Sequence, residues 1–600
     1  MTTLAKHQTV ESHNSDYEAG LNLGLRLRET SVGAVLAGAI VIVAALARLF
    51  ALGGRPFDAA EAARALTALG FVQGQPADLT AFSPLLTNLN LLLFFVTGAG
   101  DFWARLVPAL SGIALVALPM LRFRDRLGTG GALAASVLLA LSPTFLLFSR
   151  SVDPALLSAV TSLVFVGAVF DFVDRRERRD LLIAAGALAL ALIAGPGTYT
   201  VLLFMLVFAA GAWILHRYRG AAGWDRIAAA FQTIRRDRQG LARAGAVFGA
   251  TFIVAATGFL VNFGGLQAAL NQFVNWLASF SLAREYPAWY YAGLLVLYEP
   301  AILLFGLVGA AVVVRRRDLF GLFLVTWAVG SLALYTLVGR TEPSLVVPIL
   351  LPLVFLAGWG VASVFELADV DEALRALLVA AFIVPLLVYA VLQLAFYAET
   401  ATRSVNLVLA LGAAAMAAVV AVVFASSRFG MAWRPATVAR GVGFSLLLLS
   451  VGLTLHSAWQ LNFLRLDPVR ELLLIAPTSP DVREMVGVVA TTSQDRVGDT
   501  VSIPITVDGR LAPIVPWYLR DFTNMTVVDE VHQPPGTPIV IVPATDEMPP
   551  IGDQYVGQGF RLSLGWRPMG LTGSQLARWY FYREGAVVPT TDLILFVARQ

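Results

Sequence analysis

The chain has 600 residues, of which 58% are hydrophobic and 14% are charged, with a formal net charge of +3. A soluble protein of ordinary composition is about 45–50% apolar and about 25% charged, so this composition excludes that class. It predicts a mainly α-helical, polytopic membrane protein. The absence of cysteine excludes disulfides, thiolate metal sites and cysteine nucleophiles, and no motif indicates a nucleic-acid partner.

Apolar runs divide the chain into a tail, a membrane domain and a C-terminal region. Residues 1–32 are mostly polar and do not resemble a cleavable signal peptide, so we expect a cytoplasmic tail. The membrane domain, 33–459, holds runs close to the roughly 17–25 residues that span a bilayer. Thirteen spans are expected, at 33–52, 104–121, 131–148, 154–173, 181–195, 198–215, 244–262, 290–314, 319–338, 344–362, 376–397, 405–425 and 440–458.

Arginine-rich segments predict the orientation of the chain in the cell membrane. If 85–97 lies in the interface without crossing, the basic segments share one side, at 122–126, 174–180, 217–243, 315–318 and 427–434. Basic loops face the cytoplasm, so this side and the N-terminus are assigned to it. The first outer loop, 53–103, and the C-terminal region then lie outside the cytoplasm.

The segment 217–243 has amphipathic helical spacing and many arginines. Such a segment is drawn to anionic lipid, so we expect it on the cytoplasmic leaflet. A solvated cytoplasmic helix is the alternative.

The C-terminal region, 460–600, has the pattern of a small α/β domain. Short β-branched runs at 501–507, 526–531, 538–543 and 593–597 are separated by Pro, Gly and Asp turns. Helical patches lie near 480–490. These features predict an extracytoplasmic α/β domain.

The first candidate site is formed by Asp58 and Glu61, in the loop that follows the first span. A spacing of three places both carboxylates on one helix face, where they can act as a general base and its orienting group, or bind a cation. The alternative is structural: Asp58 caps a helix beginning at Ala59, with Glu61 at the third position of a capping box.

A second candidate lies in SPTFLLFSRSVDPALL, 142–157, where Arg150 and Asp153 stand between two spans. Asp153 before Pro154 is also a good helix N-cap. The functional interpretation is favoured because this turn and the first loop are expected on the same side. Two elements that bring carboxylates to one cavity are what an acid–base site needs.

Two later segments complete the candidate residues. Trp289 and Tyr290 begin a span, and they are typical of an interfacial aromatic belt or of an aromatic wall for a sugar or prenyl chain. Glu299 lies two turns further on, where a buried carboxylate needs a partner. Arg340 and Glu342 stand at the outer end of another span; the arginine can bind phosphate, or the two can form an interfacial ion pair.

The order of these elements resembles the GT-C membrane glycosyltransferases. It is similar to the protein O-mannosyltransferases, the lipid A aminoarabinose transferases and, in particular, the flippase activity-associated branch. The resemblance covers residues 35–360, and WYLRDF at 517–522 is similar to the same branch. Its segments are the acidic first loop, SPLLTNLN, DFWARLVPALSGIALVALPML, RFRDRLG, LLALSPTFLLFSRSVD, PAWYYAGLLVLYEP and TEPSLVVPILLPLVFLAGWG.

This resemblance implies transfer of a sugar from a polyprenyl-phosphate donor to a glycan, lipid or protein acceptor on the outer face. It implies Asp58 or Glu61 as the general base and Asp153 as the group that positions the acceptor. Arg150 and Arg340 would contact the lipid phosphate. No cofactor and no metal site is expected; a divalent cation is compatible with the carboxylates, but no motif indicates one.

The chain departs from the family pattern at two positions. Aligned on the family's adjacent Asp-Glu, RPFDAAEAARAL places Ala60 at the aspartate and retains Glu61. The family's Gly-Glu-Lys is represented by Arg340, Thr341 and Glu342. A second hypothesis therefore stays open, a catalytically degenerate subunit or scaffold in a surface-glycan assembly. A transporter is disfavoured because no internal repeat is found.

Overall fold

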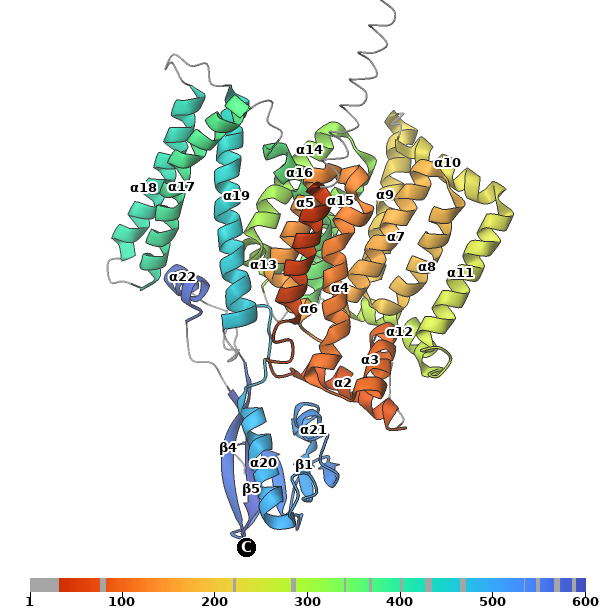
Figure 1. Cartoon of the computed structure of the whole chain (residues 1–600), viewed down its shortest axis with the longest axis vertical. Helices are drawn as coiled ribbons and strands as arrows, with labels where there is room; N and C mark the ends of the chain where they lie inside the picture. Colours follow the sequence, from red (N-terminus) through yellow and green to blue (C-terminus); the bar gives the residue numbers. More distant parts are fainter. Residues whose placement is uncertain are drawn as a thin grey trace, which may run out of the picture.

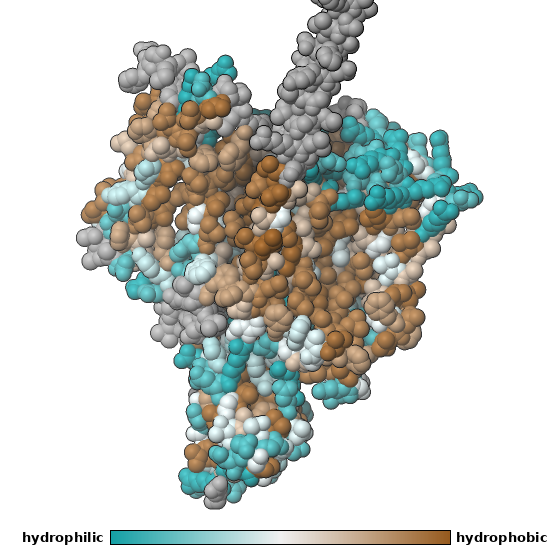
Figure 2. Space-filling model, in the orientation of Figure 1, coloured by the Kyte–Doolittle hydropathy of each residue, from teal (hydrophilic) through white to brown (hydrophobic). Residues whose placement is uncertain are grey.

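The computed structural model describes residues 32–75, 83–219, 223–281, 287–338, 342–365, 370–399, 403–426, 434–464, 471–533, 535–545, 551–565, 572–584 and 590–599. Figure 1 shows a large helical bundle with a small sheet-containing domain at one end. On the face seen in Figure 2 the surface of the bundle is largely apolar, and hydrophilic surface gathers on the sheet domain and at the opposite end near α10. The predicted class, a polytopic helical membrane protein with a small C-terminal α/β domain, is confirmed.

The helices of the bundle follow one another with few residues between them. After the N-terminal helix Val32–Leu49 they are α2 (Ala59–Val72), α3 (Pro84–Thr97), α4 (Asp101–Arg122), α5 (Arg124–Leu141), α6 (Pro143–Ser149), α7 (Ala155–Arg175), α8 (Arg178–Ala194), α9 (Gly197–Arg219), α10 (Gly223–Arg236), α11 (Arg238–Ala256), α12 (Gly264–Ala278), α13 (Tyr290–Tyr298), α14 (Pro300–Arg316), α15 (Leu319–Val338), η1 (Pro343–Leu345), α16 (Val346–Val364), α17 (Val370–Glu399), α18 (Arg403–Ala425), α19 (Pro435–Trp459) and η2 (Gln460–Leu464).

The number of membrane-crossing helices is close to the predicted number. Within the described residues, ten helices are long and apolar enough to span a membrane, or twelve if each of two bent pairs is one span. Every one of them matches a predicted run. The thirteenth run corresponds to α8, which has 17 residues and is the shortest of the set. The interfacial segment 85–97 forms α3, whose 14 residues reach about 21 Å, too short for a bilayer core of about 30 Å.

Two spans are broken by a polar residue followed by proline. Helices α5 and α6 meet at an angle of 62° across Ser142, and α13 and α14 meet at 103° across Glu299. Pro143 and Pro300 each occupy the first turn of the second helix, where the missing N–H costs nothing. The break therefore falls just before each proline, because the preceding helix cannot continue through the ring.

Helix α16 is the centre of the bundle. It is buried over nearly its whole length and packs against α5, α14 and α15. Glycines allow the close approach: a Cβ on Gly309 of α14 would meet the carbonyl of Leu356, and one on Gly358 would meet the carbonyl of Gly131. Small residues of this kind are what membrane helices use to pack tightly without a hydrophobic driving force.

The C-terminal region forms a five-stranded mixed sheet with short helices beside it. Strand β1 pairs in parallel with β2 and β3, and β5 pairs antiparallel with β3 and β4, which gives the order β2-β1-β3-β5-β4. The central strands β1 and β3 are buried along their whole length. Its elements are α20 (Asp481–Val497), β1 (Ile505–Asp508), η3 (Gly509–Leu511), α21 (Ile514–Tyr518), β2 (Met525–Val528), β3 (Ile539–Pro543), β4 (Tyr555–Leu564), α22 (Gly573–Tyr582) and β5 (Thr590–Ala598).

Two features of this region were not predicted. Strand β4 contains Gly557 and Gly559, and these glycines weaken the β-strand pattern of its sequence. Its pairing with β5 holds it in the sheet. Helix α22 packs against α17 of the bundle rather than on the sheet (Figure 1). Its buried Arg583 forms an ion pair with Glu471 at 2.7 Å, which fixes the helix beside α13.

Three of the predicted basic segments gather at the end of the bundle opposite the sheet domain. Arg126 forms ion pairs with Asp171 and Asp174, and Arg178 pairs with Asp237 at the start of α11. Helix α10 crosses this end and packs against α7, α9 and α11. Its Arg226, Arg235 and Arg236 are exposed, together with Phe231. The charge pattern of the sequence thus corresponds to one end of the structure.

Candidate active site

Helix α2 begins with the capping box expected from its sequence. The Asp58 carboxylate accepts a hydrogen bond from the backbone N–H of Glu61 at 2.8 Å, and the Glu61 carboxylate accepts one from the backbone N–H of Asp58 at 3.3 Å. The structural alternative for this pair is therefore present. The capping box does not account for the whole site, because both carboxylates have neighbours other than the residues at the start of the helix.

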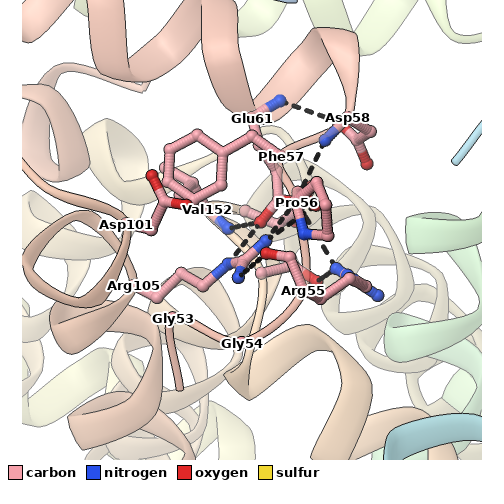
Figure 3. Close-up of polar contacts among 12 residues, drawn as sticks. Gly53, Gly54, Arg55, Pro56, Phe57, Asp58, Glu61, Asp101, Arg105 and Val152 are labelled. Atoms are coloured by element: carbon pink, nitrogen blue, oxygen red, sulfur yellow. Dashed lines mark hydrogen bonds and ion pairs between the residues drawn. The ribbon is translucent and has the colours of Figure 1, made fainter. Parts of the chain in front are cut away.

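Glu61 is enclosed by donors (Figure 3). Arg105 binds it with two parallel hydrogen bonds, Nε to Oε1 at 2.9 Å and Nη2 to Oε2 at 2.8 Å. The backbone N–H of Val152 donates to Oε1 at 2.7 Å, and Arg55 lies 3.5 Å from Oε2. The side chains of Glu61 and Arg105 are 2% and 0% exposed, so this is a buried ion pair with satisfied geometry.

The two carboxylates of α2 differ in acidity. Burial alone would raise the pKa of Glu61, but the charges of Arg105 and Arg55 outweigh it and lower that pKa to about 2. For Asp58, burial and the neighbouring Glu61 charge raise the pKa above its ordinary value. Neighbouring titratable groups with pKa values pushed apart are a common mark of divided acid–base roles. Asp58 is the more basic of the two.

Arg105 is positioned by the loop it anchors. It projects from the first turns of α4 and donates Nη1 to the carbonyls of Leu52 and Arg55, at 3.1 and 2.8 Å. Its guanidinium lies over the ring of Phe57, 4.6 Å from the centroid. The arginine therefore fixes the path of residues 52–57 as well as the charge of Glu61.

The turn after α6 supplies the other wall of the site. Arg55 Nη2 donates to Ser151 Oγ at 2.9 Å, and Arg64 of α2 donates to the carbonyl of Val152 at 2.7 Å. Asp153 lies 3.4 Å from Arg64 and accepts a hydrogen bond from the backbone N–H of Ala155, at the start of α7. The structure thus brings Asp153 to α2, the helix that carries Glu61, while Asp153 also accepts the N–H of the first residue of α7.

Arg150 has a different set of partners from the one expected. Its Nη1 donates to the carbonyls of Ala47, Arg48 and Phe50, and its Nη2 to that of Ala51. These are the terminal carbonyls of the N-terminal helix and the turn after it, which lack intrahelical donors. In this structure Arg150 completes the end of that helix.

Glu299 and Tyr290 lie apart from this cluster, at the two ends of α13, and Glu299 lies at the other end of α6. Glu299 accepts hydrogen bonds from Ser142 and Thr144, and the Tyr290 hydroxyl donates to the carbonyl of Leu472 at 2.8 Å. The seven residues of α6, about 10 Å of helix, separate Glu299 from the Glu61 cluster.

The last three predicted residues are Trp289, Glu342 and Arg340. Trp289 is half exposed at the start of α13. The backbone carbonyl of Glu342 accepts a hydrogen bond from Tyr291 at 3.2 Å. Arg340 lies outside the described residues.

The C-terminal domain closes over the first loop. Asp101 accepts hydrogen bonds from Trp517 Nε1 at 2.8 Å and from the Tyr518 hydroxyl at 3.3 Å, and it pairs with Arg483 at 2.8 Å. The same Tyr518 oxygen accepts a hydrogen bond from the backbone N–H of Phe57 at 2.7 Å. Residues 517–522, singled out in the sequence, therefore lie directly against the loop that carries Asp58.

Sequence reasoning missed three arginines of this site, Arg55, Arg64 and Arg105. Arg105 had a signal, because an arginine four residues into an apolar span is costly unless it is paired. Arg55 Nη2 is engaged, whereas its Nε and Nη1 find no acceptor among the described residues, and the side chain is 20% exposed. Asp58 Oδ2 is likewise without a hydrogen-bond donor in the described part of the chain.

The arrangement has the components of an acid–base and anion-binding site. It contains a carboxylate of raised pKa and a guanidinium near it, each with polar atoms that find no partner among the described residues, at the edge of the apolar bundle. Among the described residues no group of three or more His, Cys, Asp or Glu is placed to hold a metal ion. The acid–base and anion-binding groups on which the proposal below draws are Asp58 and Arg55 with their neighbours.

Comparison with known proteins gives structural matches only. No family model matches the chain, and no curated protein matches it. ArnT from Cupriavidus metallidurans bound to undecaprenyl phosphate matches with 15% identity and a TM-score of 0.48, over 82% of this chain and 85% of ArnT. The archaeal oligosaccharyltransferase AglB from Archaeoglobus fulgidus matches with 11% identity and a TM-score of 0.47, over 83% and 64% of the two chains. The arabinosyltransferase EmbB from Mycobacterium smegmatis matches with 12% identity and a TM-score of 0.38, over 73% and 42%.

All three are GT-C membrane glycosyltransferases. This is the superfamily that the sequence resembles. At these identities and scores the matches say nothing about substrate or about individual residues, so the roles of Asp58, Arg55 and their neighbours follow from their own contacts.

Proposed function

We propose that the protein is an integral membrane glycosyltransferase that takes its sugar from a polyprenyl-phosphate donor. The observation that carries the proposal is that Asp58 and Arg55 both contact Glu61 at the edge of the apolar bundle. Asp58 has a raised pKa and an oxygen with no donor among the described residues, and Arg55 has two nitrogens with no acceptor there. A lipid-linked donor suits this place, because its tail stays in the bilayer while its phosphate meets a guanidinium. The sequence resemblance to GT-C enzymes supports the same reaction class.

In the proposed reaction Asp58 is the general base. Its Oδ2 takes the proton of an acceptor hydroxyl, and the resulting oxygen nucleophile forms a bond to the anomeric carbon of the donor. The bond from that carbon to the phosphate oxygen breaks, and polyprenyl phosphate leaves with the electron pair, its charge stabilised by Arg55. Asp153, held by Arg64, positions the acceptor. The anomeric configuration is inverted in a single displacement.

Glu61 is assigned a supporting part in this scheme. A carboxylate whose pKa is about 2 and whose two oxygens already accept five hydrogen bonds or ion-pair contacts is a poor base at neutral pH. Its charge holds Arg105 and Arg55 in place. The general base is therefore Asp58 of the two candidates.

The test of donor binding uses undecaprenyl phosphate, the lipid bound in the ArnT structure. We expect the purified protein to bind it, and Arg55→Gln to weaken binding about tenfold or more, because a charge-assisted contact to phosphate is lost. Arg440→Gln is the matched control, since Arg440 is also a partly exposed arginine in an ion pair. It lies near the start of α19, at the end of that helix away from the candidate site. Equal affinity for the wild type and both variants would remove Arg55 from the phosphate site.

A second candidate function is a non-catalytic membrane subunit. It is favoured by the ion pair that occupies the Glu61 carboxylate and by Ala60 at the family's aspartate position. Such a subunit would hold lipid or a partner enzyme through its C-terminal domain. Binding of undecaprenyl phosphate without any transfer, together with co-purification of an intact homologue, would favour it over the enzyme.

We propose that the C-terminal domain and α2 lie outside the cytoplasm, with the N-terminus and α10 on the cytoplasmic side. The exposed arginines of α10 support this orientation, because they suit an anionic cytoplasmic leaflet. The chain contains no cysteine, so introduced cysteines report sidedness without background. In intact cells an impermeant maleimide should label Val527→Cys, in β2, and should label Gln239→Cys only after lysis. The reverse pattern would invert the proposed orientation.

A further inference from the structure

The two broken spans of the bundle meet at one side chain. Glu299, at the break between α13 and α14, is wholly buried. Its Oε1 accepts hydrogen bonds from Ser142 Oγ at 2.5 Å and from the backbone N–H of Thr144 at 3.0 Å. Ser142 and Thr144 lie at the other break, where α5 ends and α6 begins. One carboxyl group therefore fixes both breaks relative to each other.

Helix α6 is held at both ends, by Glu299 at its first turn and by Arg150, which directly follows its last residue. All seven of its residues are buried. Six of them have apolar or small side chains, and such side chains slide past their neighbours more easily than hydrogen bonds break. The polar contacts at its first turn are those to Glu299 and one from Asn462 Nδ2 to the carbonyl of Pro143, at 3.3 Å. Glu299 therefore holds the first turn of α6, while Arg150 and the Val152 N–H hold its other end.

That other end delivers the wall of the candidate active site. Immediately after α6, Ser151 Oγ accepts a hydrogen bond from Arg55, and the Val152 N–H donates to Glu61 at 2.7 Å. A helix rises about 1.5 Å per residue, so a shift of α6 by one residue would lengthen these contacts beyond hydrogen-bond range. The site then loses two of the contacts that hold Arg55 and Glu61.

We infer that Glu299 is a positioning residue: its carboxyl group couples the two broken spans and holds α6 so that Ser151 and Val152 meet Arg55 and Glu61. The importance of this coupling for catalysis rests on the proposed function, whereas the coupling itself is independent of that function. Glu299 contributes no atom to the reacting groups. It acts through about 10 Å of buried helix.

The test uses the reactivity of a single thiol, since the sequence has no cysteine. Val152→Cys places the thiol at a fully buried position whose hydrogen bonds are made by its backbone, so the site is kept. In this background, Glu299→Leu removes the acceptor, and Glu299→Gln retains an acceptor oxygen. We expect maleimide to label the thiol at position 152 about tenfold faster in the Glu299→Leu variant than with the native glutamate, and Glu299→Gln to restore the slow rate.

A second thiol separates this effect from general loosening. Val489→Cys lies fully buried in α20 of the C-terminal domain, and its labelling should stay slow in every Glu299 variant. Ser142→Ala, which removes one donor and leaves the carboxyl group, should accelerate labelling at position 152 by a smaller factor, and it takes the place of Glu299→Leu if that variant is not recovered folded.

The inference is overturned by an unchanged rate at position 152, by rates that rise together at 152 and 489, or by Glu299→Gln behaving like the leucine variant. Labelling needs no donor lipid and no transfer. A failure of the proposed glycosyl transfer would instead be seen in the Asp58 and Arg55 variants with this coupling intact, so the two outcomes are distinguishable.

Discussion

Replacing Arg105 with methionine is expected to lower the free energy of unfolding by about 3–5 kcal/mol, the cost of removing one partner from a buried ion pair. The methionine fills similar volume but leaves the Glu61 carboxylate buried without its two strongest donors. It also leaves the carbonyls of Leu52 and Arg55 without Arg105 Nη1. The midpoint of chemical or thermal unfolding, measured on the purified protein in detergent, checks this.

Arg175→Met is the matched control. Arg175 also pairs with an aspartate, Asp125 at 3.4 Å, but the two side chains are 53% and 84% exposed. Exposed pairs contribute about 0–1 kcal/mol, so this variant should unfold close to the wild type. The double variant Glu61→Met with Arg105→Met should recover part of the stability lost by Arg105→Met alone, since no buried charge is then unpaired. Equal effects of Arg105→Met and Arg175→Met would contradict the burial argument.

The same pair predicts how stability depends on acid. The pKa of Glu61 is lowered from 4.5 to about 2 in the folded protein. A lowered pKa means that the ionised group stabilises the fold fully above the unfolded value and loses this contribution as the pH falls from about 4.5 towards 2. In Arg105→Met this acid-dependent loss should shrink, because the charge that lowers the pKa of Glu61 has been removed. Unfolding midpoints measured across this pH range for the wild type and the variant check the difference.

The sequence was informative wherever a signal is local. The D-x-x-E spacing predicted the capping box of α2, and the side on which the basic loops fall predicted that 85–97 does not cross the membrane. Apolar runs placed every span, because length and hydropathy need no knowledge of neighbours. The alternative for Asp153, a helix cap, was local as well; Asp153 accepts the N–H of Ala155, although Pro154 takes the N-cap position of α7.

The parts that the sequence could not provide are contacts between distant segments. Arg105 meets Glu61 across 44 residues, and Tyr518 meets Phe57 across 461. Arg150 was expected at phosphate because an arginine at a span end suits an anion, but unpaired carbonyls of the N-terminal helix compete for the same donors. Nothing in the residues around position 150 decides between these partners. Glu299 was assigned with the site residues, yet its partner Ser142 lies on a different broken span.

Asp58→Asn is expected to lower the rate of sugar transfer by about 10²–10⁴, the usual contribution of a general base. Asparagine is as good a helix N-cap as aspartate, so its side chain can still accept the Glu61 N–H and preserve α2. The variant therefore removes the base and keeps the fold. Because burial and the charge of Glu61 raise the pKa of Asp58, the wild-type rate should fall with decreasing pH through a pKa above 3.8.

Asp237→Asn is the control for this substitution, because Asp237 is also an N-cap aspartate, accepting the backbone N–H of Gly240 at the start of α11. It lies at the end of the bundle away from the candidate site, so transfer should be unchanged. The readout is sugar transfer from a polyprenyl-phosphate donor by purified protein, with undecaprenyl phosphate release as the second measure. Full activity of Asp58→Asn would assign the base elsewhere, whereas a wild type that binds the lipid but transfers nothing would favour the non-catalytic subunit. A loss confined to Asp58→Asn, with binding of undecaprenyl phosphate retained, assigns the proton transfer to Asp58, because lipid binding depends on Arg55 and the cap is intact.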